Sequence, residues 1–360
     1  MARRTLLIGT TVAASAALFV FTPGAASAAP HQPSVTVLTN DVSAPFQLDY
    51  RGGLYVADGG TGAVSKLDGG ALSPVAHAPD GFETSGVAVG PDGGIAYTTA
   101  NEDHSSTSLT IERNGRTTIA DLSRFEAKKN PDQHVTYGVD HPSRCVKRAF
   151  APLGGATMKG AVDSHPYAVD SLGHGDWAVA DAGGNDVVRV DGGTGKVSLI
   201  AVLPRQPLKV TAQQAADLGL TKCVVGVTYN FEAVPTDVEL GPDGLLYVTT
   251  LPGGPEGPVL GARGSVYTVN PSTGRVHRLA TGFLGATNLT VDSHGKVYVA
   301  ELFAGQISTI SHGVAKPYVA LRNALAVQMG GGKLYASTIA PTDEMGNPTG
   351  EPGSIVRIGS

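Results

Sequence analysis

The fold is decided by residues 234–279, which read VPTDVELGPDGLLYVTTLPGGPEGPVLGARGSVYTVNPSTGRVHRL. Four short segments in this stretch alternate apolar and polar residues, as half-buried β-strands do. The turn sequences GPDG and NPSTG separate the first pair and the last pair, because proline presets φ and glycine accepts positive φ. The stretch therefore predicts one antiparallel four-stranded sheet, with strands at residues 236–240, 245–250, 265–270 and 275–279.

The same unit recurs along the chain. Its second strand ends at Thr250, and five other segments share that register: LYVAD ending at Asp58, IAYTT at Thr99, WAVAD at Asp181, VYVAE at Glu301 and LYAST at Thr338. These anchors lie 41, 82, 69, 51 and 37 residues apart. The short spacings match one four-stranded propeller blade, and the long spacings match a blade with an insertion. We therefore expect an all-β fold, a six-bladed β-propeller with short helical insertions.

Composition agrees with this interpretation. The chain has 360 residues with 48 Gly and 23 Pro, a density of turn residues typical of an all-β protein. The sixth unit has three strands of its own, and residues 34–39 (SVTVLT) form a strand ahead of the first unit. We expect this N-terminal strand to complete the sixth blade and close the ring, which removes free sheet edges. Residues 29–360 are thus predicted to form a single domain.

Residues 1–28 have the pattern of a secretory signal peptide. Arg3 and Arg4 precede an uncharged apolar run at residues 6–21, and Ala26-Ser27-Ala28 is an A-x-A cleavage sequence. A membrane anchor is the alternative, but the apolar run is short and Pro23-Gly24 follows it. The two arginines leave twin-arginine export open beside general secretion. We expect an extracellular protein with no membrane span after cleavage.

The charge balance limits the partners. The formal net charge is −5, and loss of Arg3 and Arg4 makes it −7. A mildly acidic chain argues against nucleic acid or an anionic membrane as partner. We expect a monomer that binds a small molecule, a glycan or a protein.

Two long insertions, residues 123–163 and 204–232, interrupt the repeat. The first contains Ser123-Arg124-Phe125-Glu126, a capping-box sequence, and the second has Thr211 before AQQAADL; each predicts a short helix. Each insertion also holds one of the two cysteines, Cys145 and Cys223. In an exported chain this pair favours a disulfide. Two free thiols, or a Cys/His metal site with His134 or His141, are the alternatives.

All the long connections fall on one face of the predicted ring. The turns between first and second strands are short throughout, whereas the insertions and the loops at residues 251–263 and 339–352 lie at the opposite end of the strands. Long loops on a rigid scaffold are where binding usually resides. The sequence therefore indicates a long-loop face as the working face.

Six polar residues are expected at the central mouth of that face. Asp58, Asp181 and Glu301 end second strands, and His165, Asp237 and Asn288 begin first strands. Converging oxygen atoms could hold Ca²⁺, and carboxylates there could act as acid or base. The alternative is that these side chains hydrogen-bond the local backbone. No metal-protease, CxxC or nucleophile-elbow motif occurs elsewhere in the chain.

Four stretches carry a family resemblance: HPYAV (165–169), VADAGGNDVVRVD (179–191), AVPTDVELGPDGLLYVTTLPGG (233–254) and NPTGEPGSIVRI (347–358). With them the chain resembles the ScyD/ScyE-type family of exported bacterial β-propellers, named after scytonemin-biosynthesis clusters. The resemblance covers nearly all of the mature chain and implies fold and export rather than catalytic residues. Gluconolactonase/SMP-30, NHL and strictosidine-synthase-like propellers are more distantly similar.

The sequence thus predicts a secreted scaffold that binds a ligand, glycan or protein through the long-loop face, with no catalysis evident. A metal-assisted hydrolase or lyase of the SMP-30/lactonase-like type, using the acids at the mouth, is the alternative. Asp237 is the residue most favoured for either role, with a hydrogen bond that locks neighbouring blades as the equal alternative.

Overall fold

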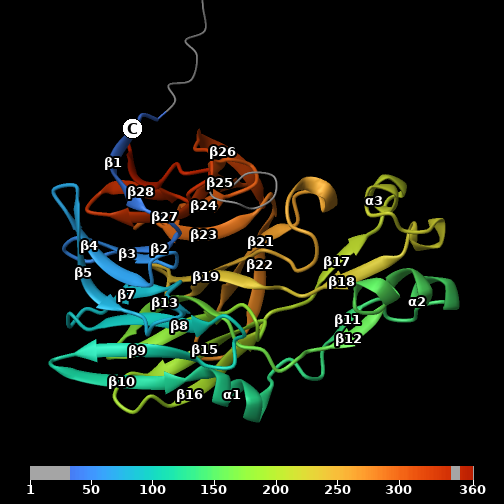
Figure 1. Ribbon diagram of the computed structural model, residues 1–360, viewed down its shortest axis with the longest axis horizontal. Helices are drawn as coiled ribbons and strands as arrows, with labels where there is room; N and C mark the ends of the chain where they lie inside the picture. The colour runs from blue at the N-terminus through green and yellow to red at the C-terminus, as the bar shows by residue number, and fades with distance from the viewer. Residues whose placement is uncertain (1–32, 342–348, 360) are drawn as a thin grey trace, which may run out of the picture. The chain divides into compact units, whose positions relative to one another are not determined.

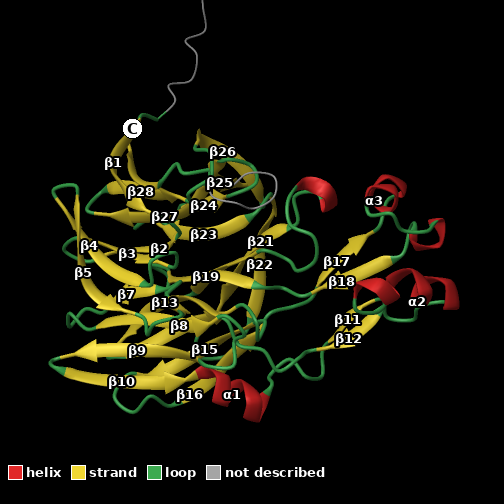
Figure 2. Cartoon of the chain, viewed as in Figure 1, coloured by secondary structure: helices red, strands yellow, loops and turns green. Residues whose placement is uncertain are grey.

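The computed structural model describes residues 33–341 and 349–359 of the chain. The predicted signal peptide, residues 1–28, and residues 342–348 of the loop at residues 339–352 lie outside the described residues. Residues from Pro33 onward form one compact unit, which is all-β with a few short helices (Figure 2).

The stretch that decides the fold forms the predicted antiparallel sheet, here called the fourth sheet. Its order is β19-β20-β21-β22, with Leu240 opposite Leu246 and Leu246 opposite Val269. Gly244 adopts φ +78° in the GPDG turn, as the turn chemistry requires. The strands are β19 (Pro235–Leu240), β20 (Leu246–Thr250), β21 (Gly264–Val269) and β22 (Val276–Phe283).

Four further sheets repeat this antiparallel pattern in chain order. A single parallel pairing between Thr281 and Val314 joins the fourth and fifth sheets. The first sheet contains β2 (Pro45–Tyr50), β3 (Leu54–Asp58), β4 (Ala63–Asp68) and β5 (Ala71–His77). The second contains β6 (Phe82–Glu83), β7 (Val87–Val89), β8 (Ile95–Asn101), β9 (Thr107–Arg113) and β10 (Arg116–Asp121). The third contains β13 (Pro166–Gly173), β14 (Asp176–Asp181), β15 (Asp186–Asp191) and β16 (Val197–Val202), and the fifth contains β23 (Ala286–Val291), β24 (Val297–Glu301), β25 (Gln306–Ser311) and β26 (Val314–Ala320).

The sixth sheet combines both ends of the described chain (Figure 1). Its order is β1-β29-β28-β27, and Val35 of β1 lies opposite Ile358 of β29. The predicted strand at residues 34–39 is therefore confirmed as the missing member, although it extends further than expected. The strands are β1 (Val35–Val42), β27 (Ala324–Gly330), β28 (Lys333–Thr338) and β29 (Gly353–Ile358).

The first strands of the sheets pack against one another in the cyclic order β2, β7, β13, β19, β23, β27 and back to β2. Polar side chains on these strands accept backbone N–H groups of the next strand, which pairs donors that would otherwise be buried without a partner. These bonds are Asp49 Oδ2 to Val89 N (2.7 Å), Asp170 Oδ2 to Leu240 N (2.6 Å), Glu239 Oε1 to Val291 N (3.2 Å) and Asn288 Oδ1 to Val327 N (2.8 Å). Between β28 and β2, Ser337 Oγ donates to Pro45 O (2.7 Å).

The two insertions fold together into a separate small sheet, here called the arm, with order β12-β11-β18-β17. The sequence predicted helices in these insertions but not this sheet. Two helices, α2 and α3, accompany the sheet (Figure 1). The elements of the insertions are α1 (Leu122–Lys129), β11 (Thr136–Gly138), α2 (Arg144–Phe150), η1 (Ala151–Leu153), β12 (Thr157–Lys159), β17 (Gln206–Lys209), α3 (Ala212–Asp217), η2 (Lys222–Val224) and β18 (Thr228–Phe231), and η3 (Pro258–Leu260) lies in the loop after β20.

The helix caps are partly as predicted. Thr211 caps α3 in a capping box with Gln214, as expected. The prediction of Ser123 as the cap of the first helix is wrong, because the cap is Asp121, two residues earlier, which accepts the N–H of Arg124 at 2.8 Å. Asp121 is the better cap here because its carboxylate also favours the positive end of the helix dipole.

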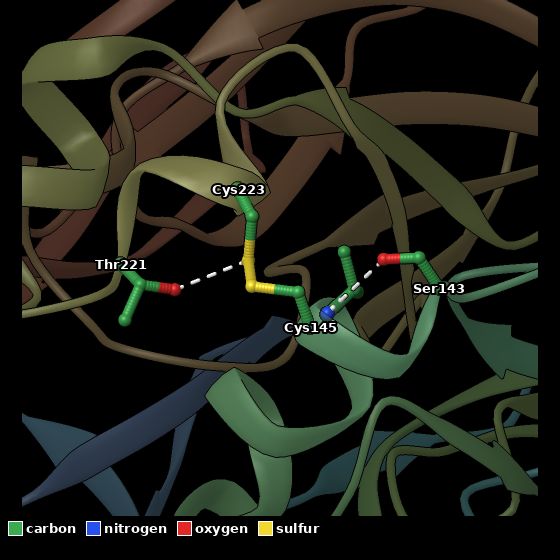
Figure 3. Close-up of a disulfide and its surroundings, with 5 residues drawn as sticks. Ser143, Cys145, Thr221 and Cys223 are labelled. Atoms are coloured by element: carbon green, nitrogen blue, oxygen red, sulfur yellow. Dashed lines mark hydrogen bonds between the residues drawn. A yellow bond between two sulfur atoms is a disulfide. The ribbon is translucent and has the colours of Figure 1, made fainter.

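A disulfide between Cys145 and Cys223 joins α2 to η2 in the arm (Figure 3), as predicted. The bond closes a separation of 78 residues, which on the chain-entropy model stabilises the fold by about 4 kcal/mol. Around it Val146, Phe150 and Val224 form a small core of the arm's own. No helix among residues 33–341 and 349–359 is long and apolar enough to cross a membrane.

Candidate functional site

The three carboxylates that end second strands all fix local backbone. Each accepts an N–H from the residues that lead into the first strand of its own sheet, so each ties the start of a sheet to its second strand. The bonds are Asp58 Oδ1 to Ala44 N (2.8 Å), Asp181 Oδ1 to His165 N (2.6 Å) and Glu301 Oε2 to Leu284 N (2.6 Å). Ligand binding by these three carboxylates stays a prediction.

Asp237 and Asn288 lie on first strands and are almost fully buried. Asp237 Oδ2 accepts the N–H of Leu289 at 2.8 Å, and Asn288 Oδ1 accepts the N–H of Val327 at 2.8 Å. Both side chains therefore link neighbouring sheets near the centre of the cyclic arrangement. A binding role for either residue also stays a prediction.

Gln47 of β2, which the sequence analysis did not single out, links its own strand to three other first strands. Its Oε1 accepts the N–H groups of Val87 (2.9 Å) and Val169 (3.1 Å). Its Nε2 donates to the Val169 carbonyl at 3.0 Å and to Asp237 Oδ1 at 3.2 Å. Because β2, β7, β13 and β19 all meet at this amide, Gln47 fills the centre of the arrangement.

A polar cavity of about 150 Å³ extends from Gln47 toward the tight-turn end of the sheets. Burial raises the pKa of Asp170 to about 7 and of Asp237 to about 8, and it raises the pKa of Glu239 well above its usual value. The cavity's polar lining includes Gln47, Asp49, Arg51, Asp170, Asp237, Glu239 and Gln328.

Aromatic rings lie at the long-loop end of the centre. Phe46 of β2 and Tyr167 of β13 meet edge to face, with ring centroids 5.2 Å apart. His165 lies against the same tyrosine at 5.7 Å. His165 and these two rings lie at the long-loop ends of β2 and β13, and Gln47 follows Phe46 along β2 toward the cavity.

Two histidine–carboxylate pairs lie at this end. His165 Nε2 is 2.5 Å from Glu83 Oε1, and His104 Nδ1 is 3.0 Å from Asp163 Oδ1. The two imidazole rings lie 4.2 Å apart and stay partly open to solvent, with 23% and 30% of the His165 and His104 side chains exposed. Of the six predicted site residues, the structure thus brings His165 alone into a cluster of partly exposed titratable groups.

The electrostatics of the pairs favour an ionised glutamate. Burial raises the pKa of Glu83, but the hydrogen bond and the positive charge of His165 outweigh burial and leave this pKa below its usual value. Ser85 Oγ donates a further hydrogen bond to Glu83 Oε1 at 3.2 Å. A carboxylate that holds one imidazole nitrogen in place leaves the other nitrogen to exchange protons with a ligand.

Ca²⁺ at the mouth stays a prediction. The oxygens of Asp58, Asp181, Asp237, Asn288 and Glu301 accept hydrogen bonds from the protein's own donors. Within residues 33–341 and 349–359, no three His, Cys, Asp or Glu side chains already surround a point suited to a metal ion.

Comparison with solved structures supports the fold class. The chain is similar to a gluconolactonase from Xanthomonas campestris, with TM-score 0.52 and 12% identity over 91% of this chain and 90% of that one. It is also similar to a PQQ-bound aldose sugar dehydrogenase from Streptomyces coelicolor, with TM-score 0.51 and 13% identity over 92% and 99%. Likeness at this identity shows the fold alone, a propeller-like all-β fold.

No family model matches the chain. No curated protein matches it either.

Proposed function

We propose that this protein is an exported six-bladed β-propeller formed by residues 29–360, related to the ScyD/ScyE-type family. The cyclic packing of the first strands and the N-terminal strand in the sixth sheet support six blades. The disulfide is compatible with an extracellular location. The motifs at residues 165–169, 179–191 and 233–254 support the family relation.

We propose further that the long-loop end of the propeller is an acid–base site for a small molecule, of the hydrolase or lyase class. One observation carries this proposal: two imidazoles, each held by a carboxylate, lie 4.2 Å apart and partly exposed at the mouth. Pairs of titratable groups gathered in this way are characteristic of acid–base sites.

The proposed acid–base chemistry uses the ring nitrogen of each histidine that its carboxylate does not hold. Glu83 holds Nε2 of His165 and Asp163 holds Nδ1 of His104, and the other nitrogen of each ring has no hydrogen-bond partner among the described residues. With a lactone or ester, one neutral imidazole takes a proton from water as the water oxygen attacks the carbonyl carbon. The second imidazole, protonated, gives its proton to the departing alkoxide as the C–O bond breaks.

The second candidate is a binding scaffold without turnover, which the placement of the insertions at one end of the sheets favours. Its ligand would be a small molecule, a glycan or a protein. The neighbours named gluconolactonase and aldose sugar dehydrogenase suggest sugars and sugar lactones as the first compounds to test for either role.

The experiment follows hydrolysis of a panel of aldonolactones and simple esters by acid release, with the purified mature protein. Two variants are matched to the geometry: His165→Gln keeps a donor for Glu83, and His104→Asn keeps one for Asp163, while each removes the second ring nitrogen. We expect each to lower kcat/KM by about 10²–10⁴-fold. His294→Asn, in an exposed turn at the opposite end, is the control and should retain full activity.

Saturable binding of a panel compound without turnover, weakened by the same two substitutions, would favour the scaffold. Turnover that survives both substitutions would refute the acid–base proposal.

A further inference from the structure

A second group of carboxylates is buried beside the turn between β14 and β15. Asp181 and Asp186 flank this turn, and Glu126 reaches it from α1. All three crowd the α-carbon of Gly184: a methyl group there would lie 3.4 Å from Glu126 Oε2 and 3.5 Å from each aspartate Cγ. Asp132, which follows α1, joins the group through Asn185, whose Nδ2 donates to Asp132 Oδ2 at 3.1 Å.

Several oxygens of this group have no hydrogen-bond partner. Asp186 is 1% exposed, and neither of its carboxylate oxygens is bonded within the described part of the chain. Glu126 Oε1 and Asp132 Oδ1 are likewise buried and unpartnered, on residues that are 2% and 0% exposed. Buried polar atoms nearly always have a partner in folded proteins, so these four oxygens point to a missing one.

The group also has no balancing positive charge. None of the ion pairs formed by the described residues involves Glu126, Asp132, Asp181 or Asp186. Burial, followed by repulsion from the neighbouring carboxylates, raises the pKa of Glu126 to about 8 and the pKa of Asp186 well above its usual value. Several buried carboxylates side by side are costly in free energy unless they take up protons or bind a cation.

We propose that Glu126, Asp132 and Asp186 bind one hard divalent cation, Ca²⁺ before Mg²⁺, beside Gly184. The donors at hand are all oxygens, which is the ligand set that Ca²⁺ takes, and Ca²⁺ tolerates irregular geometry. These side chains do not yet surround one point at ligand distance. The described residues give the side chains of Glu126 and Asp186 no hydrogen bond to lose when they turn toward a cation, whereas Asp132 Oδ2 is held by Tyr137 and Asn185.

Asp181 forms the fixed side of the site, because its oxygens are bonded to His165 N, Gly184 N and Ser164 Oγ. This location differs from the Ca²⁺ site expected at the tunnel mouth, with which it shares only Asp181. The proposal does not depend on acid–base chemistry at the histidine pairs.

The cation would fasten the base of the arm to the third sheet. Glu126 and Asp132 belong to the first insertion, whereas Asp186 begins β15. Glu232, at the end of the second insertion, approaches the same place, with Oε1 3.4 Å from Asn185 Nδ2. We therefore expect the cation to stabilise the fold in addition to occupying a site.

The test is calorimetric titration of CaCl₂ into mature protein freed of metal by a chelator, with thermal melts in parallel. We expect one saturable site per chain and a melting temperature that rises with Ca²⁺. Asp186→Asn and Glu126→Gln, which keep side-chain shape, should each weaken binding at least about tenfold, a change of about 1.4 kcal/mol in binding free energy. Asp80→Asn, an exposed carboxylate elsewhere, is the matched control and should bind as the wild type does.

A second measurement locates the site in the unaltered fold. The hydroxyl of Tyr137 donates to Asp132 Oδ2 at 2.8 Å, so Tb³⁺ in the site should luminesce when tyrosine is excited, and Ca²⁺ should displace it. Tyr137→Phe should lower this emission severalfold. Absence of saturable Ca²⁺ or Mg²⁺ binding, or equal binding by Asp186→Asn and Glu126→Gln, would overturn the proposal. The proposal would also be overturned if Ca²⁺ left the melting temperature of the wild type unchanged and that temperature lay below those of the two variants at pH 8. Protons, and not a cation, would then neutralise the buried carboxylates.

Discussion

Replacing Gln47 by methionine should destabilise the whole fold, because the amide serves three neighbouring strands at once. Methionine has a similar shape but leaves the buried N–H groups of Val87 and Val169 without an acceptor. Each unpaired buried donor costs about 1–3 kcal/mol, so the two together cost about 2–6 kcal/mol. Water entering the adjoining polar cavity can satisfy part of this loss, so we expect a decrease of about 2–4 kcal/mol in the free energy of unfolding.

Urea unfolding followed by the fluorescence of Trp177 measures this change, because Trp177 is the only tryptophan and is 1% exposed. Gln328→Met is the matched control: Gln328 lines the same cavity, but within the described part of the chain its amide nitrogen donates only to the adjacent Met329 carbonyl. Its loss should therefore cost about 0.5 kcal/mol or less. A Gln47→Met protein within that margin of the wild type would refute the bridging role.

Gln47→Glu adds a test with a pH dependence. The variant keeps an acceptor for Val87 and Val169 but places an oxygen where Nε2 donates to Asp237 Oδ1. Below about pH 8, the pKa to which burial raises that of Asp237, the two carboxyl groups can share a proton. We expect the variant to lose stability as the pH rises through this value, and an unchanged difference from the wild type between pH 6 and 9 would contradict the expectation.

Three further predictions concern separate features. Deleting Val35–Val42 should lower the melting temperature by several degrees because it exposes the edge of β29, and an unchanged melt would show that the strand does not support the sheet. Replacing Cys145 and Cys223 by alanine should cost about 4 kcal/mol in unfolding free energy, and peptide mapping of unreduced protein should find the two cysteines crosslinked. Since His165 lowers the folded-state pKa of Glu83, the ionised Glu83 stabilises the fold above pH 4.5, and this stabilisation is lost as the pH falls. Between pH 6 and 3 the unfolding free energy of the wild type should therefore decrease more than that of Glu83→Gln. An equal decrease in the two proteins would contradict this.

The repeated sheets could be predicted because each strand is long enough to show alternation and each turn contains residues with a defined conformational role. The three- and four-residue strands of the arm, such as β11, are too short to show a period, so the sequence predicted only helices there. The cap of α1 was misassigned because Asp121 and Ser123 are both good capping residues two positions apart.

The candidate site could be predicted only in part for a similar reason. His165 stands at the start of a recognisable strand, whereas Glu83 lies 82 residues earlier in a strand of two residues. Gln47 is a polar residue within the apolar pattern of β2, which was a usable signal that went unnoticed. The carboxylates at strand ends were correctly placed in the repeat, and the alternative stated for them, hydrogen bonds to the local backbone, is present for all three.

The central claim, that His104 and His165 act as an acid–base pair, is tested most directly by the pH dependence of kcat/KM for the best lactone or ester in the panel. We expect kcat/KM of the wild type to follow a bell-shaped curve against pH, because one imidazole must be neutral and the other protonated. His165→Gln and His104→Asn should each remove one limb of the bell. A pH profile that keeps both limbs in both variants would contradict the claim that the two histidines act as an acid–base pair.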